Sequence, residues 1–419
     1  MRSGTAIRAG LTHFGQKLGN FCKLSRIDLT CRHLRNLVKR RNFLASAGTF
    51  ITAATVSCST NESLQNVADS QRSFSVSGNV PLRNRARDKG LIYGAFSCTN
   101  AEQFQTDAAL RAAFQEECDL VVGGFYWHRT RPDPNFFDWT LPDALFDFSQ
   151  EYKKLFRGHP LVWHKLFPEW MSEILRSTDT TTSDIEQILE THISTIVRRY
   201  AGKVHSWDVV NEAIKPEHGR NDGLRLTPWL NRLGPEYLDF TYRIAAEADP
   251  TAMLVYNDYG LEYDSKEHSK RRKSLIKLLE MFKMRGTPVH AVGIQAHLDG
   301  AKGAQSMTTL SSFLADIASM GFKILITELD VKDPTLPSDI NERDRMVAAV
   351  YEDFLTIALD QPSVISVITW GLSDKYTWLS DYAPRKDGMP VRPLPLDENM
   401  NRKSAWNAIA RAFDATSPR

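Results

Sequence analysis

The stretch KVHSWDVVNEAI, residues 203–214, carries the pattern on which the fold prediction depends. Its centre, HSWDVV (205–210), is a short β-type run with two adjacent valines, and it predicts a buried strand. The run ends abruptly in Asn211 and Glu212. Because an unpaired buried carboxylate is too costly, Glu212 must either have a partner or lie in a cleft.

Similar runs recur along the chain, and each is followed by a stretch that is typical of a helix. They are LIYGAF (91–96), CDLVVGG (118–124), FRGHPLVW (156–163), HSWDVV (205–210), MLVYND (253–258), HAVGIQAH (290–297), KILITEL (323–329) and SVITWGL (366–372). Among the helical stretches, SDIEQILETHISTIVRRY has Ser183 as its expected N-cap, and SKRRKSLIKLLEMFKMRG is expected to close on Gly286.

Eight strands that alternate with helices predict an α/β protein with a single (β/α)8 TIM barrel. An open doubly wound sheet would usually show a glycine-rich phosphate turn. The sequence has no GxGxxG or Walker-type loop, so no nucleotide cofactor is indicated.

In such a barrel the C-terminal ends of the strands gather around one open face, where catalysis occurs. Several of these ends are polar or aromatic: His159 and Trp163, Asn211 and Glu212, Asn257, Asp258 and Tyr259, Gln295 and His297, Thr327 and Glu328, and Trp370. A lone Trp or His is more often a packing or structural residue than a ligand contact. Their joint placement at the same ends of different strands is what indicates a site.

Glu212 and Glu328 would end the fourth and seventh strands and face one another across the barrel mouth. Two carboxylates around a polar, aromatic groove suit glycoside hydrolysis, in which one donates a proton to the leaving oxygen and the other attacks or stabilises the transition state. Their environments must therefore split their pKa values. Trp163, Trp370 and Trp378 are candidates to stack on sugar rings.

An ordered set of motifs also resembles a known family. The motifs are RGHPLVWH (157–164), WDVVNEAI (207–214), YNDYG (256–260), GIQAHL (293–298), ITELDV (326–331), TWGLSDKYTWL (369–379) and the closing PLDENMNRKSAWNAI (395–409). From about residue 90 to its C-terminus the chain is similar to the family 10 glycoside hydrolases, the endo-1,4-β-xylanases.

The resemblance implies a retaining mechanism with Glu212 as acid/base and Glu328 as nucleophile. It also implies a subsite for the sugar at the cleaved bond, made by His159, Trp163, Asn211, Gln295, His297 and Trp370, with Tyr259 and Trp378 along the groove. His297 would hydrogen-bond Glu328 and help keep it ionised, and Asn211 would meet a substrate hydroxyl. The expected partner is xylan or a related β-glycan, no metal or organic cofactor is needed, and we expect a monomer.

One motif departs from the family's pattern. The family's second strand runs into Pro-Glu-Asn-Glu-Met-Lys-Trp, whose Glu, Asn and Lys bind the sugar on the non-reducing side of the cleaved bond. VVGGFYWHRTRP (121–132) stands there instead, and alignment on its Trp and last Pro places Val122, Gly123 and Tyr126 at those three positions. Each lost hydrogen bond contributes on the order of 1 kcal/mol, so the sugar preference is open.

Further residues bear on the same subsite. Leu166 stands where a Gln usually follows the Trp-His pair, and His128, Arg129 and Arg131 are the candidates to compensate for the lost groups.

The N-terminal part differs in charge from the rest. Residues 1–41 hold ten Lys and Arg and one acid, an excess of +9 in a chain of net charge +2, so residues 42–419 carry −7. A mildly acidic body argues against nucleic acid as its partner. KRRNFLASAGTFITAATVSC (39–58) resembles a twin-arginine export signal and is too short and polar for a membrane-spanning helix.

We therefore expect an exported protein, reaching the periplasm or the outside. The residues before Cys58 faintly resemble a lipoprotein cleavage box, so contact with a membrane is expected only through the signal or a lipid at Cys58. The expected domains are a signal with a long basic extension (1–60), a flexible linker (61–88) and the barrel (89–416).

Three functions are compatible with these features. The first is an exported retaining endo-β-1,4-xylanase, and the second is a related barrel glycosidase that cuts another β-linked glycan. The third is a non-catalytic glycan-binding barrel, against which the presence of Glu212, Glu328, Asn211 and His297 counts. Release of reducing sugar separates the enzymes from the binder, and a glycan panel separates the two enzymes.

Overall fold

The computed structural model describes residues 72–97 and 101–419. Residues 1–71, with the expected export signal, Cys58 and the first part of the expected linker, lie outside the described residues. The strands are β1 Ile92–Phe96, β2 Leu120–Gly124, β3 Leu155–His159, β4 Ser206–Asn211, β5 Met253–Asp258, β6 Ala291–Ile294, β7 His297–Asp299, β8 Lys323–Lys332 and β9 Val364–Thr369.

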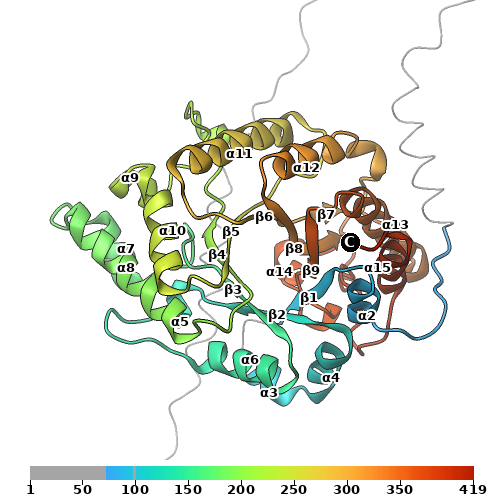
Figure 1. The fold of residues 1–419 in the computed structure, drawn as a ribbon. Helices are drawn as coiled ribbons and strands as arrows, with labels where there is room; N and C mark the ends of the chain where they lie inside the picture. Colours follow the sequence, from blue (N-terminus) through green and yellow to red (C-terminus); the bar gives the residue numbers. More distant parts are fainter. Residues whose placement is uncertain (1–71, 98–100) are drawn as a thin grey trace, which may run out of the picture. The chain divides into compact units, whose positions relative to one another are not determined.

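The strands form a closed parallel barrel, which confirms the predicted fold (Figure 1). Each of β1 to β5 pairs in parallel with the next, β6 pairs with β8, β8 with β9, and β9 closes the ring on β1. The short β7 pairs only with the outer half of β8, where His297 lies opposite Asp330. Eight strands therefore make the barrel, and β7 extends its rim.

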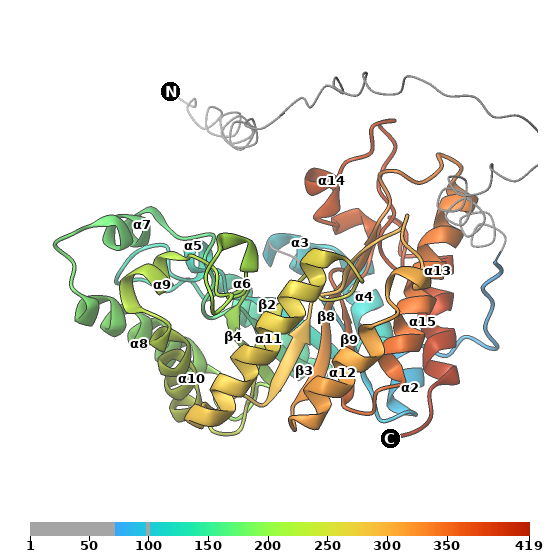
Figure 2. The same cartoon turned by 90° about the horizontal axis from the view of Figure 1, so that it is seen from above.

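Helices surround the strands in an outer ring (Figure 1). They are α2 Leu82–Arg87, α3 Ala101–Thr106, α4 Ala108–Glu117, α5 Trp127–Thr130, α6 Thr140–Glu151, α7 Glu169–Arg176, α8 Thr182–Arg199, α9 Pro228–Leu233, α10 Glu236–Ala248, α11 Lys266–Arg285, α12 Leu310–Ser319, α13 Ile340–Leu359, α14 Leu379–Tyr382 and α15 Ser404–Ala415, with the 3-10 turns η1 Pro216–His218, η2 Ala304–Ser306 and η3 Asp374–Tyr376. In Figure 2, α14, which follows β9, and the C-terminus lie at opposite ends of the barrel. Within the described ranges no helix is both long and apolar enough to cross a membrane.

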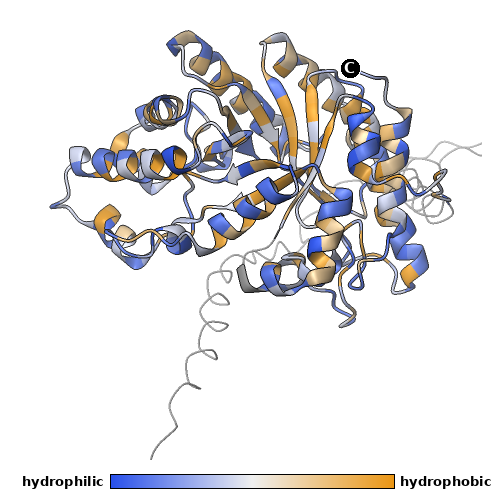
Figure 3. Cartoon of the chain, turned by 60° about the horizontal axis from the view of Figure 1, so that its bottom comes forward, coloured by the Kyte–Doolittle hydropathy of each residue, from blue (hydrophilic) through white to orange (hydrophobic). Residues whose placement is uncertain are grey.

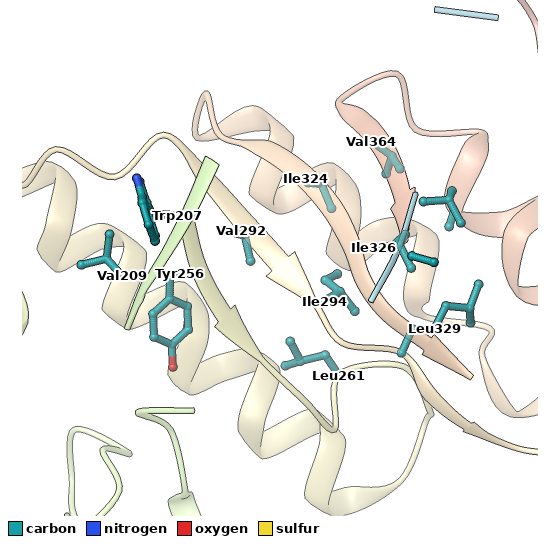
Figure 4. Packing of buried hydrophobic residues seen from close by; sticks show 14 of the residues in the cluster. Trp207, Val209, Tyr256, Leu261, Val292, Ile294, Ile324, Ile326, Leu329 and Val364 are labelled. Atoms are coloured by element: carbon teal, nitrogen blue, oxygen red, sulfur yellow. The ribbon is translucent and has the colours of Figure 1, made fainter. Parts of the chain in front are cut away.

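Alternate residues along a strand belong to different layers of the core, as the two-residue period of a strand requires. In β6 and β8, Val292, Ile294, Ile324 and Ile326 belong to the large cluster that includes the helices' apolar side chains (Figure 4). Leu325, between two of them, belongs to a small separate cluster inside the barrel. Figure 3 shows hydrophobic colour concentrated on the strands and on one side of many surrounding helices.

One of the two predicted helix ends agrees with the structure and the other does not. The helix expected to close on Gly286 does so, because Gly286 adopts a left-handed conformation with φ 62° that suits a residue without a side chain. The N-cap of α8 is Thr181, however, so the prediction of Ser183 was wrong. Thr181 accepts from the Asp184 backbone while the Asp184 side chain accepts in return, a reciprocal capping box.

The folded region starts before the expected boundary at residue 89. Residues 82–87, part of the expected linker, form α2, and Leu82 and Ala86 are buried. The backbone N–H of Leu82 donates to the carboxylate of Glu117 at 2.9 Å, which fixes this helix to the end of α4.

Candidate active site

Glu212 lies directly after β4 in a backbone conformation that few side chains adopt. Its φ is 60°, in the left-handed region, which is uncommon for a residue other than glycine and often marks a functional position. Its N–H donates to the carbonyl of Asn257 at 2.8 Å, and its carbonyl accepts from Nε of Arg225 at 2.6 Å. The two bonds hold the turn that directs Glu212 out of the strand.

Glu328 lies within β8 and is held by two donors. Nδ2 of Asn257 donates to its Oε1 at 2.6 Å, and Nε2 of His297 lies 3.2 Å from its Oε2. Only 5% of Glu328 is exposed, so these bonds act with little competition from water. Hydrogen bonds to both oxygens stabilise negative charge on Glu328.

A chain of amide side chains joins the two glutamates. Nε2 of Gln295 lies 3.3 Å from Oε1 of Glu212 and 3.2 Å from Oδ1 of Asn211. Oδ1 of Asn211 also accepts from Nδ2 of Asn257 at 3.0 Å, and Asn257 bonds Glu328 as described. The residues predicted at the ends of the fourth, sixth and seventh strands are thus brought together.

The carboxylate of Glu212 has fewer hydrogen-bond partners than that of Glu328. Its Oε2 is buried and has no hydrogen-bond partner among the described residues. The nearest basic groups, Nη2 of Arg225 and Nε2 of His164, lie 3.9 and 4.0 Å away. Burial and the nearby positive charge of Arg225 lower the pKa of His164 to about 3, so this ring is neutral near pH 7. One oxygen of Glu212 therefore has no hydrogen-bond partner in the described part of the chain.

His297 is placed between two carboxylates. Its Nδ1 lies 2.9 Å from Oδ1 of Asp330, opposite the contact with Glu328, and Nε1 of Trp378 donates to Oδ2 of Asp330 at 2.8 Å. Burial alone would lower the pKa of His297, but the charges of Asp330 and Glu328 outweigh it and raise that pKa well above 6.5. The protonated ring can then donate to both carboxylates.

His159 is fixed from below by charged groups inside the barrel. Its Nδ1 lies 2.8 Å from Oδ2 of Asp208, and the other oxygen of Asp208 pairs with the guanidinium of Arg157. Arg157 also donates to the hydroxyl of Ser206 at 2.9 Å. Nδ1 of His159 lies 3.9 Å from Oε1 of Glu328, so the ring borders the site.

Aromatic rings form the walls around these polar groups. Trp370 stacks on Phe96 with centroids 4.2 Å apart and meets the His159 ring edge-on at 5.0 Å. Trp163 lies 6.0 Å from the ring of Tyr126. Trp378 lies 5.1 Å from His297 and stacks on Tyr382, which is 72% exposed.

Tyr259 lies on the Glu212 side of the site. Its hydroxyl accepts from Nη2 of Arg225 at 3.0 Å, and the Arg271 guanidinium lies over its ring at 4.2 Å. Since the same nitrogen of Arg225 lies 3.9 Å from Glu212, Arg225 connects Tyr259 to the site.

The second strand places Val122 and Gly123 on opposite faces. Val122 is inside the barrel, 1% exposed, and packs with Phe96, Leu120 and Ile368. Gly123 lies on the opposite face of the strand, where an added Cβ would meet the Phe156 ring at 2.5 Å. The cluster that holds Val122 packs against Tyr126 and Trp370 of the groove wall, and neither Val122 nor Gly123 offers a side-chain hydrogen-bonding group, so the loss of sugar contacts at these positions stays a prediction.

Tyr126 borders the site directly. Its ring lies 5.9 Å from His159 and against Gly124, where an added Cβ would meet Tyr126 at 3.1 Å. Burial and the charge of Glu328 raise the pKa of its hydroxyl, so it remains a neutral donor. No partner for that hydroxyl is found in residues 72–97 and 101–419.

Sequence reasoning gave no role to three residues that the geometry connects to the site. Asn257 was noted only as a polar strand end, although it bonds Glu328, Asn211 and the hydroxyl of Thr327. Asp330 lies two residues after Glu328, a spacing that places both on one side of a strand and was a usable signal. Arg225 lies in the loop after β4, where periodicity gives no signal.

Comparison with known proteins gives a consistent result. The model of the family described as "Glycosyl hydrolase family 10" matches residues 81–412. The chain is 28% identical over 340 residues to endo-1,4-beta-xylanase B of Thermotoga neapolitana, covering 81% of this chain and 93% of that protein. It is 33% identical over 296 residues to a beta-1,4-xylanase of Dictyoglomus thermophilum, covering 68% of this chain and 78% of that protein.

Solved structures agree. Native xylanase 10B from Thermotoga maritima superposes with a TM-score of 0.71 at 29% identity, covering 80% of this chain and 98% of that one. Xylanase 10B from Thermotoga petrophila RKU-1, solved in complex with xylobiose, gives a TM-score of 0.71 at 28% identity, covering 81% of this chain and 99% of that one.

Proposed function

The chain belongs to glycosyl hydrolase family 10 and is a glycoside hydrolase, and from this premise we propose that it cuts internal β-1,4-xylosidic bonds of xylan with retention of configuration. Glu328 is the nucleophile and Glu212 the acid/base. The observation that carries this assignment is the contrast between the two carboxylates: Glu328 receives hydrogen bonds on both oxygens, whereas Oε2 of Glu212 has no partner in the described part of the chain. The names of the relatives support the substrate.

In the first step Glu328 attacks the anomeric carbon while Glu212 protonates the leaving oxygen. Asn257 and His297 hold Glu328 in place and stabilise its charge before the attack. Nε2 of Gln295 orients Glu212 and is itself held by Oδ1 of Asn211. In the second step Glu212 takes a proton from water, whose oxygen attacks the anomeric carbon and displaces Glu328, so the sugar leaves with its original configuration.

The roles are tested by two substitutions on one activated substrate. Glu212→Ala removes only proton transfer, so attack on an aryl xylobioside with a good leaving group should persist and azide should restore turnover with retained configuration. Glu328→Ala should form no glycosyl-enzyme on any substrate. Equal inactivity of the two variants on the aryl glycoside would contradict the assignment, and a glycan panel with the unchanged chain tests the substrate.

We also propose that the chain is exported by the twin-arginine route. The support is the order of Arg40, Arg41 and the apolar run to Cys58 in the sequence. Changing both arginines to lysine keeps the charge but should leave the precursor in the cytoplasm, because a receptor reads the pair. Normal export of that variant would contradict the proposal, and a lipid on a chain starting at Cys58 would show that it is anchored.

A further inference from the structure

Ala296 lies between β6 and β7 in a conformation that is uncommon for a residue with a side chain. Its φ is 60°, in the left-handed region. The residue before it, Gln295, contacts Glu212. The residue after it, His297, contacts Glu328. In a regular strand these two neighbours would point the same way, so the left-handed turn at Ala296 lets them reach different glutamates.

The backbone on either side of this turn is bonded to the neighbouring strands. The N–H of Gln295 donates to the carbonyl of Asp258 at 3.0 Å, and the carbonyl of Gln295 accepts from the N–H of Glu328 at 2.9 Å. The N–H of Ala296 donates instead to a side chain, Oε1 of Glu262, at 3.1 Å. Because Ala296 is fully buried, water does not replace this acceptor.

Glu262 lies in the loop after β5 and is itself buried. Its second oxygen, Oε2, accepts from the N–H of Leu261 at 2.8 Å. Arg272 of α11 fixes this loop, since it donates to the carbonyls of Leu261 at 2.5 Å and of Glu262 at 2.8 Å. Nδ1 of His268 lies 3.6 Å from Oε2 but accepts from the N–H of Tyr263, so it is no donor to Glu262. Both carboxylate oxygens are therefore used by backbone N–H groups.

We propose that Glu262 is a positioning residue for the reaction: its carboxylate holds Ala296 in the left-handed conformation. The residues on the two sides of Ala296 are thereby kept in contact with the two glutamates. Backbone held against its own preference persists only where the surroundings fix it, and the bond from Ala296 to Glu262 is such a fixing contact. This role rests on the proposed function, in which the two glutamates do the chemistry, and adds a residue that acts on them through the backbone.

The first variant is Glu262→Gln, which keeps the size of the side chain. An amide has one acceptor oxygen and one NH2 group, so one of the two backbone N–H groups must face a donor. Ala296 should then relax from its left-handed conformation and displace its neighbours from the glutamates. We expect kcat on an aryl xylobioside to fall about tenfold with little change in KM, because displaced catalytic groups slow the reaction more than they weaken binding.

The second variant, Ala296→Gly, separates this role from a general loss of structure. Glycine adopts a positive φ without steric cost, so the turn should depend less on Glu262. The measured quantity is the factor by which Glu262→Gln lowers kcat in each background, which divides out any effect of Ala296→Gly by itself. We expect about tenfold in the unchanged background and less than about threefold in the Ala296→Gly background. Equal factors overturn the proposal, as does an unaltered kcat in Glu262→Gln.

The matched control is another buried carboxylate that accepts from backbone N–H groups. Asp249, after α10, accepts from the N–H of Gly202 at 3.0 Å and of Thr251 at 2.9 Å. Asp249→Asn should lower the thermal midpoint and leave kcat unchanged, and a fall of kcat as large as that of Glu262→Gln overturns the proposal.

Hydrogen exchange gives a readout that does not need activity. Residues 291–299, which span β6 to β7, should exchange faster in Glu262→Gln than in the unchanged chain, and not in Asp249→Asn. Equal exchange in Glu262→Gln and the unchanged chain overturns the proposal. If the unchanged chain does not cleave the aryl xylobioside, the proposed function has failed, and exchange still decides whether Glu262 holds the turn.

Discussion

The imidazole Nε2 of His297 lies 3.2 Å from Oε2 of Glu328, and this contact is the first of a series that runs away from the site. The other nitrogen of the ring contacts Asp330, and Asp330 accepts from the indole of Trp378. Because Asp330 is 1% exposed, its charge is felt strongly by His297. The series thus keeps a proton on His297, where it can donate to the nucleophile.

Replacing Asp330 tests this relationship. Asp330→Asn keeps the shape but removes the charge that raises the pKa of His297, so that pKa should fall towards 6.5. Above the new pKa the ring loses its positive charge and keeps one N–H, so Glu328 loses the charge-assisted donor that stabilises it. The fall of kcat/KM on the alkaline side should therefore begin at lower pH than in the unchanged chain. A profile from pH 5 to 9 on an aryl xylobioside checks this, and coincident alkaline limbs would refute it.

Asn257 offers a second test at the nucleophile. Asn257→Asp replaces the 2.6 Å donor to Glu328 by a carboxylate of the same size. Two adjacent carboxylates disfavour a second negative charge, so one holds a proton near neutral pH and Glu328 becomes a poorer nucleophile. We expect kcat on the aryl glycoside to fall about a hundredfold, roughly 3 kcal/mol, with partial recovery at higher pH. Unchanged kcat would show that Asn257 only packs.

His192 predicts how stability depends on pH. Its ring is 0% exposed, stacks on Trp127 at 3.6 Å, and neither nitrogen has a partner among the described residues. Burial, with the charge of Arg131, lowers its pKa well below 6.5. As pH falls below about 6.5 the unfolded chain binds this proton first, so folding loses about 2 kcal/mol by pH 5.

The variant His192→Phe keeps a ring against Trp127 and removes the titration. Its free energy of unfolding should depend less on pH between 6.5 and 5 than that of the unchanged chain, whatever its absolute value. Urea unfolding at several pH values measures this. Parallel curves for the two chains would show that His192 is not the group responsible.

Much of the fold and the core of the site were open to prediction because their signals are local. Each β-type run was visible by itself, and a barrel brings the ends of all strands to one face, so Glu212 and Glu328 could be paired without knowing their distance. The partner choices of Asn257 and Asp330 could not be predicted in this way. Each contact depends on how two side chains from different strands are oriented relative to one another, and the sequence does not show this.

The surroundings of the second strand could not be predicted for a related reason. A strand alternates its faces, but which apolar side chains meet Val122 and how little space Phe156 leaves at Gly123 depend on the closed barrel. Thr181 was missed because several Thr and Ser residues precede α8 in a row, and only the return bond from Asp184 identifies the cap.

Val122 tests the register directly. Val122→Glu would place a carboxylate among Phe96, Leu120 and Ile368, opposite Arg157 on β3, whose guanidinium already pairs with Asp208. A buried carboxyl group without a partner costs several kcal/mol or must stay protonated. We expect a soluble chain with a much lower thermal midpoint, or none that folds. A stable variant with improved turnover of xylotriose would show that residue 122 reaches the groove after all.

Tyr126→Phe tests whether the hydroxyl of Tyr126, in the loop after β2, contacts the substrate. Tyr126→Phe keeps the ring that packs against Gly124 and His159 but removes the unpartnered hydroxyl. Losing one hydrogen bond to a substrate hydroxyl should lower kcat/KM on xylotriose about fivefold, since such a bond is worth about 1 kcal/mol. The thermal midpoint should not change, because the hydroxyl bonds no described residue.

The matched control is Tyr242→Phe. The hydroxyl of Tyr242 donates to the carbonyl of Val255 at 3.0 Å in the core, so its removal should show the reverse: lower stability and unchanged kcat/KM. Unchanged kinetics in Tyr126→Phe would mean that the ring lines the groove while its hydroxyl only meets water.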